Sequence, residues 1–287
     1  MASSVVCAVD QSPHARTAPI LGADLAAQLG LATVAVYVFV PSAAAAARAP
    51  APPASSDALA AEERTRRERP ARCIASARLT DVRRRVDVGP VPDVISASEN
   101  AALIALGTHG AGGLRTMLHG SVRGTLLQIA RHPLRLVPAA AIAAEPPTGP
   151  VLAAVGSPAD AAWVGVAATL ARAYRAPLLL IHASASDGAM GSVHPAALDV
   201  FGPSVAALGD GPPAVLTRVC PGPPGDVLTT LADAVDARAI VCGTRGARRT
   251  ARGLFGSTAR RLMSDATTPV VVCPPRLAHR MRVLEAA

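Results

Sequence analysis

The sequence predicts an α/β protein made of two tandem domains, each a parallel sheet of about five strands with helices on both faces. Three observations support this fold class. Apolar runs rich in Val, Ile and Leu alternate with helical segments, the whole pattern repeats after residue 150, and 287 residues is a length typical of two domains. Because strands and helices alternate, we expect parallel strands joined by right-handed crossovers.

Composition agrees with buried strands. Hydrophobic residues make up 51% of the chain and aromatic residues only 2%, so the cores are expected to consist of Val, Leu, Ile and Ala. The chain has no lysine; all 28 basic residues are arginine and the formal net charge is +8. This excess is typical of a GC-rich genome, or it attracts partners that carry phosphate. No platform of aromatic residues accompanies it, so we do not expect nucleic-acid binding.

The cysteines and the apolar runs exclude other classes of protein. The cysteines are odd in number and scattered, without a C-x-x-C pair, which excludes a disulfide framework and a zinc site: Cys7, Cys73, Cys220, Cys242 and Cys273. The N-terminus opens on a strand rather than a secretory signal. The longest apolar run, residues 31–47, is interrupted by Pro41 and is too short to span a bilayer. We therefore expect a cytoplasmic protein with no membrane partner.

The first domain is expected to cover residues 1–140. Its first strand ends before Asp10, Ser12 can cap the next helix with Pro13 at the first helical position, and Gly30 ends that helix. The expected strands are 4–9, 34–40, 82–88, 101–106 and 134–137, and the expected helices are 17–29, 57–69, a short one from 93, and one ending at about 131.

The second domain is expected to cover residues 148–287, after a linker rich in Ala and Pro at 139–150. A segment rich in Gly, Ser and Pro, residues 185–213, shows little periodicity. Trp163 lies on a predicted helix, and we expect it to serve packing. The expected strands are 151–155, 177–182, 215–219, 237–242 and 270–273, and the expected helices are 160–175, 226–235 and one after the second glycine loop.

A glycine motif follows the fourth strand of each half. In both copies two residues separate the first two glycines and nine separate the second from a Gly-Ser pair: Gly107, Gly110, Gly120 and Ser121, then Gly243, Gly246, Gly256 and Ser257. From residue 107 to 138 the copies align with 243–274 without a gap, with 11 of 32 positions identical. Glycines let the backbone approach a ligand, and a helix start offers free N–H groups to an anion. The glycines would alternatively serve only as turns and caps; their duplication favours an ancestral anion site.

Both halves resemble the universal stress protein family, whose nucleotide-binding members carry this G-x2-G-x9-G-(S/T) motif. The resemblance covers nearly the whole chain and includes the opening strand with Asp10-x-Ser12-Pro13. It implies two Rossmann-like domains with strand order 3-2-1-4-5, and ATP with its phosphates on the glycine loop. It places Asp10 near ribose, phosphate or Mg²⁺, and Val38 where its backbone can bond adenine. With the motifs, the implied nucleotide-binding set also contains Ser12, Val122 and Thr258.

The second half departs from the family pattern. Val155 stands where the first half has Asp10, and Ala183 stands where it has Val38. The second loop is richer in arginine: Arg245, Arg248, Arg249, Arg252, Arg260 and Arg261. Two interpretations remain open: the second site binds phosphate through charge and backbone, or it has decayed. The resemblance also implies that the last strands of the two halves pair within the chain as a pseudo-dimer, and it allows a homodimer.

No catalytic constellation is visible. The sequence lacks a P-loop, a nucleophile elbow and paired carboxylates beside the glycine loop, so we expect no enzyme activity beyond weak ATP hydrolysis. The sequence favours an ATP-binding regulatory or stress-response protein. The alternatives are an interaction or dimerisation module that binds no nucleotide, and a slow ATPase.

Overall fold

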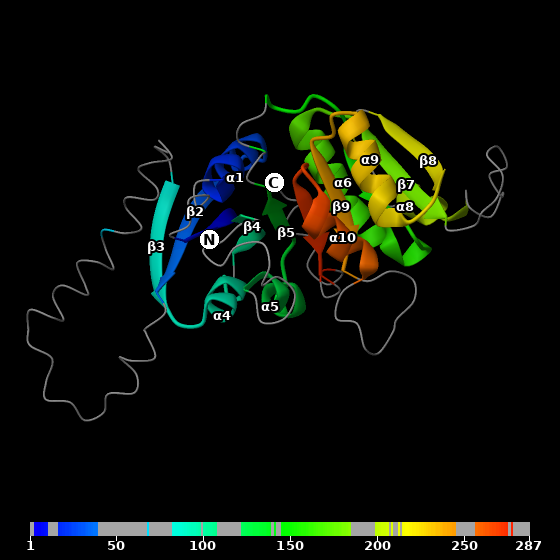
Figure 1. The fold of residues 1–287 in the computed structure, drawn as a ribbon. Helices are drawn as coiled ribbons and strands as arrows, with labels where there is room; N and C mark the ends of the chain where they lie inside the picture. Colours follow the sequence, from blue (N-terminus) through cyan, green and yellow to red (C-terminus); the bar gives the residue numbers. More distant parts are fainter. Residues whose placement is uncertain are drawn as a thin grey trace, which may run out of the picture.

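One ten-stranded sheet runs through the molecule, in the order β3-β2-β1-β4-β5-β10-β9-β6-β7-β8 (Figure 1). The structure is a computed structural model. It describes residues 3–10, 17–39, 68, 82–98, 100–107, 122–138, 141, 145–184, 199–206, 208, 212, 214–244, 256–274 and 277. The strands are β1 (Ser4–Val9), β2 (Ala32–Phe39), β3 (Val82–Val88), β4 (Ala101–Gly107), β5 (Leu134–Val137), β6 (Val151–Ala154), β7 (Leu178–Ser184), β8 (Val215–Pro221), β9 (Ala239–Gly243) and β10 (Val270–Cys273).

Helices connect the strands within each half. They are α1 (Thr17–Gln28), α4 (Val91–Ser96), α5 (Val122–Ile129), the 3-10 turn η2 (Pro158–Asp160), α6 (Ala161–Tyr174), α8 (Gly202–Ala206), α9 (Pro224–Ala234) and α10 (Ser257–Asp265). α8 lies inside the segment that the sequence predicted to have little regular structure. The predicted helix at 57–69 lies outside the described residues, apart from the single position 68.

The expected strand order 3-2-1-4-5 is confirmed in each half. Reading inward from either edge gives β3-β2-β1-β4-β5 and β8-β7-β6-β9-β10, with all neighbours inside each half parallel. The two halves meet where β5 pairs antiparallel with β10, Arg135 opposite Val271. This confirms the pairing of last strands within one chain. The two predicted sheets are therefore one continuous sheet, and the β5 edge is used inside the chain rather than left for a second copy.

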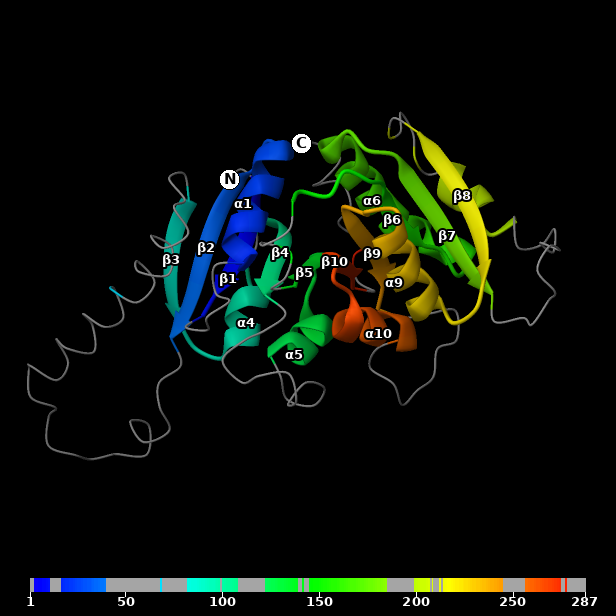
Figure 2. The ribbon, with the colours of Figure 1, turned by 45° about the horizontal axis from the view of Figure 1, so that its top comes forward.

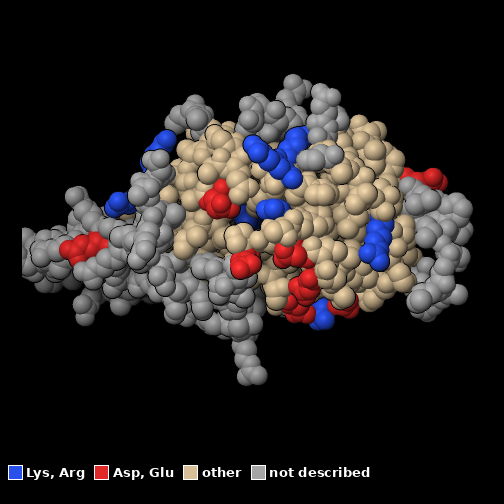
Figure 3. Space-filling model, turned by 90° about the horizontal axis from the view of Figure 1, so that it is seen from above, with Lys and Arg blue, Asp and Glu red and all other residues tan. Residues whose placement is uncertain are grey.

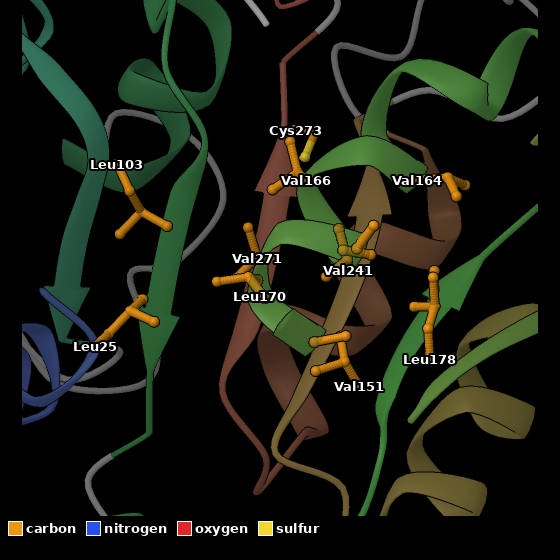
Figure 4. Close-up of a cluster of buried hydrophobic side chains, with 14 of the residues drawn as sticks. Leu25, Leu103, Val151, Val164, Val166, Leu170, Leu178, Val241, Val271 and Cys273 are labelled. Atoms are coloured by element: carbon orange, nitrogen blue, oxygen red, sulfur yellow. The ribbon is translucent and has the colours of Figure 1, made fainter. Parts of the chain in front are cut away.

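Helices cover both faces of the sheet, and each face has a core that spans both halves (Figures 1 and 2). On one face α1 and α6 cover alternate strand residues; Val166 and Leu170 of α6 lie over Val241 and Val271 (Figure 4). On the other face lie α4, α5, α9 and α10. The packing of α1 is close, since a methyl group added at Gly22 would overlap the sulfur of Cys7. No helix among the described residues is long and apolar enough to cross a bilayer.

Candidate functional site

The topology brings three predicted site residues to one edge of the first half. β1 lies between β2 and β4, and all three strands run parallel. Val9 pairs with Tyr37, so Asp10 follows beside Val38. Cys7 pairs with Ala105, which places Gly107, two residues further along β4, at the same edge. Strand order reverses between β1 and β4, and ligands of open α/β sheets bind outside the carboxyl ends at such a switch point.

The chemistry of this edge suits a polar ligand. Asp10 is exposed, and Val38 and Gly107 are partly exposed. An exposed carboxylate at the end of a strand can bond hydroxyls or share a cation with phosphate. Helix α5 begins at Val122, as the motif requires, but its side chain and the predicted residues Ser12, Gly110, Gly120 and Ser121 lie outside the described residues.

In the second half, α10 begins directly against the end of β9. The N–H of Gly256 donates to the carbonyl of Thr244, at 2.6 Å, and Ser257 and Thr258 form the first turn of the helix. The N-cap residue of α10 is Gly256, which has no side chain to cap that turn. The Thr244 hydroxyl is buried and has no hydrogen-bond partner among the residues that the structure describes. The strand and the helix that flank this loop thus lie as the motif requires; Gly246 lies outside the described residues.

One of the arginines that the sequence assigns to the second glycine loop forms ion pairs within the protein. Arg261, on α10, bonds Asp226 of α9 through Nε and Asp265 through Nη1, both at 2.7 Å. The hydrogen bond to Asp226 raises the pKa of Arg261. This guanidinium therefore joins α9 to α10, and it is not an uncommitted phosphate ligand. Figure 3 shows arginine and acidic side chains interspersed over one face of the molecule.

A carboxylate that the sequence did not single out fills the first loop of the second half. Asp160 ends η2, and its Oδ2 accepts the N–H groups of Gly156, at 2.6 Å, and Ser157, at 3.0 Å. Its Oδ1 accepts the Ser157 hydroxyl at 3.0 Å. Asp160 is 6% exposed, and this burial raises its pKa against the opposing effect of the hydrogen bonds. The loop that replaces Asp10 by Val155 thus carries an internal anion on its amides.

Trp163 lies on a helix and packs against the core, as predicted, but the sequence did not predict which groups it contacts. It lies on the first turn of α6, and its Nε1–H donates to the carbonyl of Ala154, at the end of β6, at 3.0 Å. Its ring lies on Gly243, at the end of β9. One signal was available: six residues after Ser12 the first half has Ala18, and six after Ser157 the second half has Trp163.

Side chains of the second half also cover the carboxyl end of β7. The Nδ1 of His182 lies 2.8 Å from the carbonyl oxygen of Val155, and its ring meets Phe201 edge-on, with centroids 6.4 Å apart. Phe201 precedes α8 and is 3% exposed. α8 in turn packs on η2 and α6. Ala183, the predicted counterpart of Val38, follows His182 on the strand and is partly buried.

Among the described residues no three His, Cys, Asp or Glu side chains gather closely enough to hold a metal ion by themselves. Mg²⁺ commonly takes only one or two carboxylates and completes its shell with phosphate oxygens and water. A single exposed carboxylate such as Asp10 fits that role.

Known proteins resemble this chain along its length. The model of the universal stress protein family matches residues 1–138 and 148–274. A universal stress protein from Archaeoglobus fulgidus DSM 4304 is 22% identical over 95% of this chain and 98% of its own, with a TM-score of 0.65. A functionally unknown protein from Pseudomonas aeruginosa PAO1 is 17% identical over 100% of this chain and 98% of its own, with a TM-score of 0.59.

A shorter relative matches one half only. The universal stress protein from Archaeoglobus fulgidus solved in complex with dAMP is 24% identical over 43% of this chain and 96% of its own, with a TM-score of 0.35. The whole-chain likenesses show the same fold, and the family match covers both repeats. The chain therefore belongs to the universal stress protein family, as a tandem of two such domains.

Proposed function

We propose that the protein binds an adenine nucleotide, ATP with Mg²⁺, in its first half and acts as a nucleotide-dependent regulatory protein of the stress response. The observation that carries the proposal is the meeting of Asp10, Val38 and Gly107 at one switch point. In this arrangement Asp10 contacts ribose or the phosphate-bound cation, the backbone of Val38 bonds the base, and the glycine loop receives the phosphates. The loop from Gly107 to Ser121, with Val122 opening α5, completes the site.

Isothermal titration of the full chain with Mg-ATP tests the proposal. We expect saturable binding, and we expect Asp10→Ala to weaken it by about 10- to 100-fold, since a hydrogen bond to a charged group contributes roughly 1.5–3 kcal/mol. Asp24→Ala is the matched control, because Asp24 is an exposed carboxylate of the same half that bonds Gln28 on α1.

Two results would contradict this function. If the chain binds no nucleotide at millimolar concentration, the fold serves as an interaction module instead. If ATP is hydrolysed at a steady rate that Asp10→Ala abolishes, the protein is a slow ATPase and the release of phosphate becomes part of its function.

A further inference from the structure

The second half has its own switch point, between the ends of β6 and β9. Its strand order β8-β7-β6-β9-β10 repeats that of the first half, so strand order reverses there as well. By the general rule for open α/β sheets, a ligand of this half would bind outside the carboxyl ends at Ala154 and Gly243.

One side chain of the protein already joins those two strand ends. Trp163 donates its indole N–H to the carbonyl of Ala154 at 3.0 Å. A methyl group added at Gly243 would lie 2.6, 2.8 and 2.9 Å from three carbons of the same ring. The indole therefore lies in contact with Gly243 while bonded to β6, and it spans the position where a ligand would have to enter.

The backbone donors of the adjoining loop are likewise committed. Asp160 takes the N–H groups of Gly156 and Ser157 and the Ser157 hydroxyl. An anion arriving at this loop would meet donors that are already satisfied and a carboxylate that repels it. At the end of β7, the ring of His182 bonds the carbonyl of Val155 and contacts Phe201, so side chains of the protein also cover this strand end.

We propose that Trp163 and Asp160 close the switch point of the second half against nucleotides, so that the protein takes one nucleotide per chain, in its first half. The number of one nucleotide per chain rests on the proposed function of the first half. The closure of the second half does not depend on that function. Counting from Ser12, the first half has Ala15 and Ala18 at these two places. At this switch point the second half thus carries two side chains that the first half lacks, and it lacks the carboxylate of Asp10.

The test counts nucleotides on the full chain by isothermal titration with Mg-ATP, for wild type and for the double variant Asp160→Ala/Trp163→Ala. The variant places at both positions the residues of the first half. We expect one nucleotide per wild-type chain and one more on the variant. The control is Tyr174→Ala/Asp233→Ala, which removes an aromatic ring from the other end of α6 and an exposed carboxylate from α9, and should leave the count unchanged.

The outcomes separate the two proposals. The number bound by wild type tests the proposed function, and the increment in the folded double variant tests the closure. A double variant that binds no more than wild type overturns the closure, and so does a wild type that binds two per chain. A wild type that binds none, with a variant that binds one, overturns the proposed function and supports the closure.

A second measurement decides the matter if the double variant fails to fold. Trp163 is the only tryptophan of the chain, so its emission reports on this switch point alone. We expect saturating Mg-ATP to leave the emission of wild type unchanged, and a nucleotide-dependent quench or shift would overturn the closure.

Discussion

Substituting Gly243 by alanine should test the contact between the strand end and the indole. The added methyl group would lie 2.6 to 2.9 Å from three ring carbons of Trp163, well inside van der Waals contact. Neither partner can yield freely. Gly243 is fixed opposite Cys273 in the ladder with β10, and the ring is fixed by its bond to Ala154. The backbone of Gly243 is not left-handed, so the cost arises from space alone.

The magnitude follows from what must move. Overpacking a fixed site costs roughly 1–3 kcal/mol, and displacing the ring also loses its hydrogen bond, about 1 kcal/mol. We therefore expect Gly243→Ala to lower the free energy of unfolding by about 2–4 kcal/mol. Once Trp163→Ala has removed the ring, the same change should cost less than about 1 kcal/mol, a coupling of roughly 2 kcal/mol between neighbours.

Urea denaturation followed by far-ultraviolet circular dichroism measures the four corners of this cycle, because the signal does not depend on the tryptophan. Gly202→Ala serves as the control, since no atom of the described residues lies within 4 Å of the methyl group it would add. An equal cost of Gly243→Ala with and without the indole would refute the reasoning, because the methyl group would then be meeting something else.

Three further predictions concern buried polar groups. Asp160→Ala should lower the free energy of unfolding by about 1–3 kcal/mol, because it leaves two amide N–H groups without their acceptor. Burial raises the pKa of Asp160 above its usual 3.8, so the free energy of unfolding of the wild type should fall as pH rises above that value. The variant should not show this fall. Arg135 is 4% exposed and donates to the carbonyl of Leu21 at 2.7 Å, while its Nε has no partner among the described residues. The free energy of unfolding of Arg135→Met should therefore be within about 1.5 kcal/mol of the wild-type value, and that of Arg135→Ala should be lower by about 2 kcal/mol or more. Burial raises the pKa of both Cys7 and Cys242 to about 12, so neither thiol should react with maleimide at pH 7 until the chain unfolds.

Each of these has its own contradiction. Urea denaturation at a series of pH values from 4 to 8 measures the free energy of unfolding of wild type and Asp160→Ala, with Asp233→Ala, at an exposed carboxylate, as the control. If the free energy of unfolding depends on pH in the same way for Asp160→Ala and wild type, the pKa of Asp160 is not raised. A methionine variant of Arg135 as unstable as the alanine variant would show that its charge, rather than its volume, holds the site. Mass spectrometry of the native protein locates labelled thiols, and fast labelling at Cys7 or Cys242 would show that the core opens.

Local patterns predicted most of the fold. Apolar runs separated by Gly and Pro place the strands to within one or two residues; Ser4–Val9, Val82–Val88 and Leu134–Val137 have the bounds that the sequence predicts. The pairing of β5 with β10 joins residues far apart in sequence, and it followed only from the family resemblance. α8 was missed because five residues within a segment rich in Gly and Pro carry no helical period, and its position depends on tertiary contacts with α6 and η2.

Part of the candidate site could likewise be predicted from the sequence, and part could not. Strand ends fix where Asp10, Val38 and Gly107 lie, so topology is enough to bring them together. The contacts of Asp160 depend on the turn η2, and those of Trp163 depend on how closely the first turn of α6 approaches β9; a sequence pattern contains neither. Comparing the halves residue by residue would have exposed both substitutions, since alanines stand at the same distances from the first Ser-Pro pair.

Two glycines of the second half are required by packing, whether or not a ligand binds there. Gly243 admits the Trp163 ring, and Gly225 admits Arg261, whose side-chain carbons would lie 2.6 and 2.7 Å from an added methyl group. A duplicated motif favours a shared binding ancestor, but its retention does not require continued binding where packing alone demands glycine. The carboxylate is the better discriminator between the halves. Asp10 is exposed at its strand end, whereas Asp160 is turned inward and accepts the N–H groups of Gly156 and Ser157 in its own loop.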